Sequence, residues 1–150
     1  MDLSERGAGG LARHPWETAR VAAVADILVE LGLARPRVLD VGCGDGYAVR
    51  ELNRRLGFSE VVAQDIHLTD ALIAELAAPG VRFVRELDGL DYRADLILLL
   101  DVLEHIEDAE AWLATLARER LAAGGRILVT VPAHPILFTQ HDHALKHFRR

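Results

Sequence analysis

Residues 42–46 read Gly-Cys-Gly-Asp-Gly, so three glycines alternate with other residues within one short segment. Glycine has no Cβ atom, and a glycine-rich loop can therefore turn sharply and let a ligand lie against its backbone N–H groups. Asp40 and Asp45 bracket this loop with negative charge, which repels phosphate groups and attracts ammonium and sulfonium groups. The segment predicts a binding loop for a small ligand that carries positive charge.

Two classes of cofactor bind to loops of this kind. A dinucleotide loop has the spacing Gly-x-Gly-x-x-Gly, in which the third glycine allows the following helix to pack closely. Here that position is held by the bulky Tyr47, and the spacing is Gly-x-Gly-x-Gly instead. Spacing and charge together favour S-adenosylmethionine (SAM) over NAD. A nucleotide-dependent oxidoreductase stays a disfavoured alternative.

The loop lies between a predicted strand and a predicted helix. Residues 37–41 form a short apolar run closed by glycines, which is typical of a buried strand. Before it, residues 16–33 predict a helix, because apolar side chains recur at spacings of three and four, and we place Arg20 off that apolar stripe. The stripe consists of Val21, Val24, Leu28 and Leu31.

Helices and strands are predicted to alternate along the rest of the chain. Five apolar strands joined by helices predict an α/β fold, in which a mainly parallel sheet is covered on both faces to give a three-layer αβα sandwich. The strands are expected at residues 37–41, 60–64, 81–84, 94–100 and 126–131, and the later helices at 47–56, 69–77 and 108–121.

Three segments resemble class I SAM-dependent methyltransferases. Residues 38–46 (Val-Leu-Asp-Val-Gly-Cys-Gly-Asp-Gly) look like the first motif of that family. Residues 95–106, which include Asp-Val-Leu-Glu-His, resemble its fourth strand and the signature that follows, and residues 124–132 resemble its fifth strand. The resemblance covers roughly residues 16–150, is closest to the type 11/12 methyltransferases, and implies a Rossmann-like sandwich.

The resemblance also implies a role for each matching residue. Asp40 would reach the amino group of the methionine moiety, Asp65 would bind the ribose hydroxyls, and Asp88 would lie near the adenine, although Asp88-Gly89 is equally typical of a turn. Cys43 is expected to be a small side chain tolerated between glycines. The full set of expected cofactor-binding residues is Asp40, Gly42, Cys43, Gly44, Gly46, Asp65, Ile66, Asp88 and Asp101.

Methyl transfer requires little from side chains beyond holding the acceptor, the methyl carbon and the sulfur in line. The product is S-adenosylhomocysteine, and the acceptor implied by the resemblance is a small molecule. His105 is the candidate general base, since histidine titrates near neutral pH, and its alternative role is to pack the pocket wall at a helix start. A second alternative is a SAM-binding module without activity, completed by another chain.

The histidine-rich end of the chain suggests a further alternative. His134, His141, His143 and His147 have spacings that could gather imidazoles around an ion. RNA 2′-O-methyltransferases of the Hen1 type hold a metal with a similar cluster, and the matching residues here are Asp101, Glu104 and His105, joined by His141 or His143. The net charge of −6 disfavours nucleic acid as a partner, and no metal site is predicted.

Length and composition predict one domain, consisting of a flexible arm at residues 1–15 and a SAM-binding core at residues 16–150. The family's sheet has seven strands, and only 19 residues follow Val131, so we expect a truncated chain without the sixth and seventh strands. An uncovered fifth strand favours self-association. Without a membrane span, a signal peptide or a second cysteine, the expected location is the cytoplasm.

Overall fold

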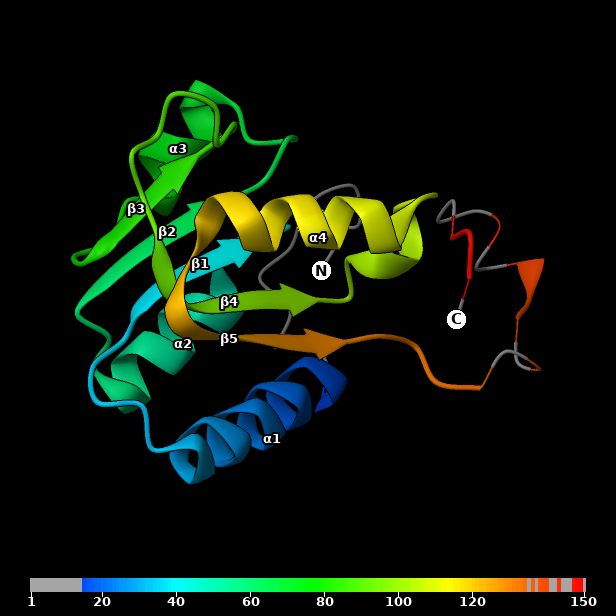
Figure 1. The fold of residues 1–150 in the computed structure, drawn as a ribbon, viewed down its shortest axis with the longest axis horizontal. Coiled ribbons are helices and arrows are strands. Elements are labelled where there is room, and N and C mark those ends of the chain that lie inside the picture. Colours follow the sequence, from blue (N-terminus) through cyan, green and yellow to red (C-terminus); the bar gives the residue numbers. More distant parts are fainter. Residues whose placement is uncertain (1–14, 135, 137, 141–142, 144–146, 150) are drawn as a thin grey trace.

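The core of the protein is a five-stranded sheet with the order β3-β2-β1-β4-β5, in which the pairings between these strands are all parallel (Figure 1). The computed structural model describes residues 15–134, 136, 138–140, 143 and 147–149. The order of the strands along the chain reverses between β1 and β4, which pair with each other in the interior of the sheet. The strands are β1 (Arg37–Val41), β2 (Glu60–Gln64), β3 (Val81–Val84), β4 (Ala94–Leu100) and β5 (Leu121–Thr130).

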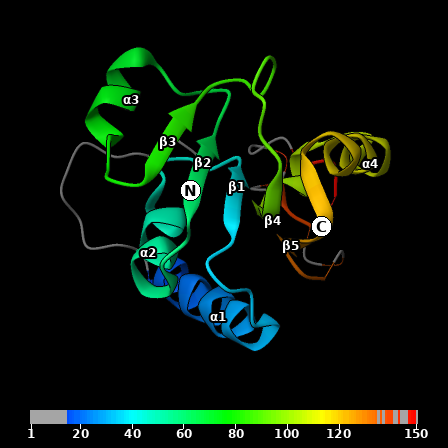
Figure 2. The same ribbon diagram turned by 60° about the vertical axis from the view of Figure 1, so that its left-hand side comes forward.

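Helices cover the two faces of this sheet, which confirms the predicted three-layer sandwich. Figures 1 and 2 show α4 on one face, with α1 and α2 on the other. Two apolar clusters match this division, because side chains of α1, α2 and α3 belong to one cluster and those of α4 to the other. The helices are α1 (Pro15–Leu31), α2 (Tyr47–Leu56), α3 (Asp70–Leu76) and α4 (Ala109–Arg120), and a short 3₁₀ helix, η2, spans Leu103–His105.

The central strand β4 explains why both faces need a covering layer. Its sequence, Ala-Asp-Leu-Ile-Leu-Leu-Leu, is apolar at six of seven positions. Successive side chains of a strand point to opposite faces, and accordingly Leu96 and Leu98 lie in the first cluster while Ile97 and Leu99 lie in the second. These four side chains are fully buried.

Helix α1 differs from the sequence prediction at its end. Val21, Val24 and Leu28 are buried as expected, but Leu31 is 43% exposed. Leu31 is the last helical residue, and Gly32 then turns the chain with a φ of 62°. Leu33, beyond the turn, packs against the apolar cluster instead.

Strand β5 begins earlier than predicted. Helix α4 starts after Asp108, whose side chain caps it by accepting a hydrogen bond from the Ala111 amide at 3.2 Å, and the helix ends at Arg120. The strand then starts directly at Leu121 rather than at residue 126. The pairing of β4 with β5 is irregular between Ala94 and Leu96, and Gly124 has a φ of 77° there. Gly124 and Gly125, which lie between the predicted helix and the predicted strand, therefore belong to the irregular part of β5.

The far edge of the sheet is partly open. Strand β5 pairs only with β4 in the described sheet, and Val129 and Val131 are 39% and 48% exposed.

Residues 1–14 of the predicted arm lie outside the described part of the chain, and Pro15 already belongs to α1. No helix among the described residues combines the length and the hydropathy that crossing a bilayer requires.

Candidate cofactor site

The glycine loop follows β1 and leads into α2, at the edge where the parallel strands end. Gly42, Gly44 and Gly46 have φ values of 71°, 55° and 69°, in the left-handed region that favours glycine. Gly42 and Gly46 also lack room for a side chain. A Cβ atom on Gly46 would lie 2.5 Å from the Phe83 ring, and one on Gly42 would lie 2.7 Å from Val102 Cγ2. Close packing and backbone conformation both require the glycines predicted from the sequence.

Asp65, directly after β2, holds the glycine loop in place. Its Oδ2 atom accepts a hydrogen bond from the Gly44 amide at 2.9 Å, and its Oδ1 atom accepts one from the His67 amide at 2.9 Å. The Cys43 amide also donates to the carbonyl oxygen of Gln64 at 2.9 Å. The structure thus brings together Asp65 and the loop, as the sequence predicted. Ile66 beside them is 73% exposed, which leaves an apolar side chain open next to the carboxylate.

Asp101, at the end of β4, is bound from two sides. The Arg20 guanidinium of α1 donates a hydrogen bond to Asp101 Oδ2, and the Thr130 hydroxyl of β5 donates to Asp101 Oδ1 at 2.8 Å. The backbone of Asp101 is left-handed, with a φ of 59°, and its amide donates to the Thr130 carbonyl oxygen at 3.0 Å. These contacts connect α1, β4 and β5 at one point.

Arg20 is a functional candidate that the sequence prediction missed. Its side chain is only 10% exposed, so placing it off the buried stripe was wrong. The signal was present in the spacing, because Arg20 precedes Val24 by four residues and Leu28 by eight, which puts all three on one helix face. Glu17, also on α1, is likewise buried, with 7% exposure.

A small cavity lies where these groups meet. Asp40 is 2% exposed at its wall, and burial raises the pKa of Asp40 to about 7, against the opposing effect of the Arg20 guanidinium. The neighbouring Cys43 is also buried, and burial raises the pKa of its thiol well above the ordinary range, so the thiol is not activated as a nucleophile. The cavity is lined by Glu17, Arg20, Asp40, Gly42, Cys43, Asp45, Tyr47, Ala48 and Leu100.

Seven of the predicted residues do not line this cavity, namely Gly44, Gly46, Asp65, Ile66, Asp88, Asp101 and His105. Asp88 lies exposed on the connection between β3 and β4, so its contact with adenine stays a prediction. His105 lies exposed in η2, where its ring centroid is 4.6 Å from that of His147. Its neighbour Glu104, which the sequence did not single out as a cofactor residue, is almost completely buried.

Comparison with known proteins agrees with this fold and loop. A family model described as a methyltransferase domain matches residues 16–149. The chain is 34% identical over 146 residues to the biotin biosynthesis bifunctional protein BioCD of Bordetella avium, covering 91% of this chain and 31% of that protein. The chain therefore spans about a third of the length of this relative.

Solved structures of methyltransferases have the same fold. The N-methyltransferase NodS from Bradyrhizobium japonicum, in complex with S-adenosylhomocysteine, superposes with a TM-score of 0.63 at 19% identity, covering 84% of this chain and 67% of that one. SAM-bound CalS10, an amino pentose methyltransferase from Micromonospora echinaspora, gives a TM-score of 0.63 at 24% identity, covering 89% and 62%. The chain belongs to the methyltransferase domain family, within the class I SAM-dependent methyltransferases. The cofactor of this class is SAM.

Proposed function

We propose that this chain binds SAM at the glycine loop and transfers its methyl group to a small-molecule acceptor. The main support is that Arg20, Asp40 and Asp65 meet the glycine loop at the carboxyl edge of the sheet, where open parallel sheets bind ligands. The small-molecule acceptor is supported by CalS10, whose acceptor is described as an amino pentose.

The charges of the cavity fit the amino acid end of SAM. Asp40, at the cavity wall, would attract the ammonium group. Arg20 would bind the carboxylate of the cofactor, which would compete with Asp101 for the guanidinium. Asp65 would bind the ribose hydroxyls, and Ile66 would contact the adenine ring. His105 would act as the general base where the acceptor has an ionisable O–H or N–H group.

The raised pKa of Asp40 predicts that cofactor binding depends on pH. The ammonium group binds the ionised carboxylate, whereas half of the free Asp40 side chains are protonated near pH 7. The affinity for S-adenosylhomocysteine should therefore rise between pH 6 and pH 8, with a limiting slope of about tenfold per pH unit below the pKa. Titration calorimetry at the two pH values measures this dependence. Asp40→Asn is the control and should bind weakly with a flat profile, and equal affinities of the unaltered chain would contradict the assignment.

An acceptor screen tests the catalytic part of the proposal. The chain is incubated with methyl-labelled SAM and pooled amino sugars, phenols, amines and carboxylic acids, and S-adenosylhomocysteine is measured by mass spectrometry. We expect at least one pool to accelerate its formation above the rate without acceptor. Cofactor binding without acceptor-dependent product in any pool would favour the alternative of a binding module completed by another chain.

Two further predictions belong to this proposal. Self-association along β5 is supported by its open edge and by the exposed Val129 and Val131. A mass from light scattering that stays monomeric at high concentration would contradict it.

A cytoplasmic location is supported by the single, buried Cys43, and microscopy of the tagged protein in its host tests it.

A further inference from the structure

We propose that Glu104, His105 and His147 form a binding site for one divalent transition-metal ion of the zinc type. One ligand atom from each of these side chains lies within 4.8 Å of the other two. Glutamate and neutral histidine are common ligands of zinc, and a modest closure of the three side chains would bring their atoms to coordination distance.

The buried carboxylate of Glu104 is the strongest sign of a missing ligand. Glu104 is 1% exposed, and its Oε2 atom has no hydrogen-bond partner among the described residues. A buried carboxylate without a partner is costly, and such groups are normally paired or bound to a cation. A bound cation would remove that penalty.

The backbone holds His147 beside η2. The Phe148 amide donates a hydrogen bond to the Glu104 carbonyl oxygen at 2.7 Å, and the Arg149 guanidinium donates to the Glu107 carbonyl oxygen. The rings of His105 and His147 meet edge to face, at an interplanar angle of 82°. A segment distant in sequence is thus attached next to the buried carboxylate.

This set differs from the alternative that the sequence suggested. Asp101 is excluded as a ligand in this arrangement because Arg20 and Thr130 already bind its carboxylate. His141 lies outside the described residues, and the ring of His143 packs against Phe138 with centroids 4.9 Å apart. The third ligand is His147 instead.

The proposed ion would lie close to the cofactor site. Glu104 follows Asp101 by three residues, just past the end of β4. Three protein ligands leave one position of a tetrahedral ion for water or for an oxygen atom of the acceptor. The ion could therefore bind and orient an acceptor, and His105 would then be its ligand in place of the general base proposed above. Ion binding itself does not depend on the proposed methyl transfer.

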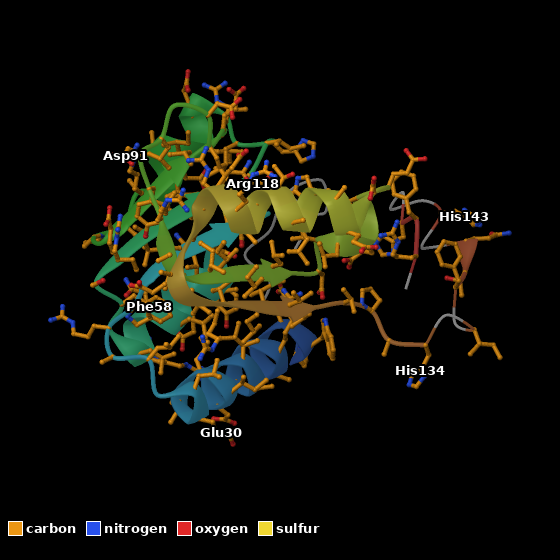
Figure 3. The ribbon with its side chains drawn as sticks, viewed as in Figure 1. Glu30, Phe58, Asp91, Arg118, His134 and His143 are labelled. Carbon is orange, nitrogen blue, oxygen red and sulfur yellow. The ribbon has the colours of Figure 1, made fainter. Side chains whose placement is uncertain are left out.

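Titration of the chain with zinc chloride, on protein purified without a histidine tag, tests this site. We expect one zinc ion per chain. His105→Ala and His147→Ala each remove one ligand and should each weaken zinc binding by about tenfold or more, because mutating even the groups that support metal ligands reduces metal affinity by that factor. His134→Ala is the matched control, since His134 is an exposed histidine on the segment beyond β5 (Figure 3) and does not belong to the cluster of Glu104, His105 and His147. This variant should bind zinc like the unaltered chain. Zinc affinity unchanged in His147→Ala, or no zinc binding by folded protein, would overturn the proposal.

A second variant separates loss of the ligand from loss of the fold. Glu104→Gln keeps the size of the buried side chain and removes its charge, so zinc binding should fall while circular dichroism stays unchanged. S-adenosylhomocysteine binding is measured on the same samples. Cofactor binding without zinc binding would reject the metal site alone, and zinc binding without cofactor binding would reject the proposed function alone.

Discussion

Replacing Asp65 with alanine should weaken S-adenosylhomocysteine binding by about a hundredfold or more. The change would remove two charge-assisted hydrogen bonds to the ribose, of roughly 1.5–3 kcal/mol each. The same change removes the acceptor for the Gly44 and His67 amides, so the loop loses its anchor as well. The affinity for 5′-methylthioadenosine, which keeps the ribose and lacks the amino acid, should fall in parallel. Titration calorimetry with both ligands measures the effect.

The control for this prediction is Asp70→Ala. Asp70 is an exposed carboxylate on α3, paired with the exposed Arg85, and its loss should leave both affinities unchanged. Thermal unfolding shows whether the Asp65→Ala chain is folded. A folded Asp65→Ala chain that binds S-adenosylhomocysteine with the original affinity would remove Asp65 from the proposed ribose site.

Arg20→Gln should produce a different pattern, because Arg20 is assigned to the amino acid end of the cofactor. We expect S-adenosylhomocysteine to bind about tenfold to a hundredfold more weakly, the effect of one or two lost charged hydrogen bonds. Binding of 5′-methylthioadenosine should change little, since it has no carboxylate for Arg20 to bind. Calorimetry with the same two ligands therefore separates the two ends of the site.

Arg20→Gln also leaves Asp101 without its cation, so the chain should unfold at a lower temperature. The double variant Arg20→Gln with Asp101→Asn removes that unpaired charge, and it should recover stability without recovering cofactor affinity. If the double variant regained both, Arg20 would have only a structural role. If Arg20→Gln weakened the binding of S-adenosylhomocysteine and of 5′-methylthioadenosine equally, the assignment of Arg20 to the carboxylate of the cofactor would likewise be contradicted.

Most of the fold could be predicted because buried parallel strands have a simple sequence pattern. The bounds of β1, β2, β3 and β4 are those expected from apolar runs closed by turn residues. The predicted start of β5 was wrong, because Gly124 lies in an irregular part of the strand pairing. A local sequence pattern cannot distinguish such a position from the end of a helix. The pairing with β4 decides that position.

The site was predictable to the extent that it is local. The glycine loop and Asp65 follow from short motifs at strand ends, and the structure joins them by hydrogen bonds. Arg20 and Glu104 were not assigned to the site, because burial of a charged side chain depends on partners distant in sequence. The partner of Arg20 is Asp101, just beyond the end of β4, and the backbone of Glu104 binds that of Phe148 near the end of the chain.

The central position of β4 has a consequence for synthesis on the ribosome. Val38 of β1 pairs with Leu96 of β4, whereas β2 and β3 join the sheet from the intervening sequence. While the chain emerges, β1, β2 and β3 can pair early, but β1 keeps one open edge until β4 has left the exit tunnel. The contact between Arg20 and Asp101 must wait for the same event. A nascent chain should therefore bind S-adenosylhomocysteine only after β4, and with it Asp101, is available.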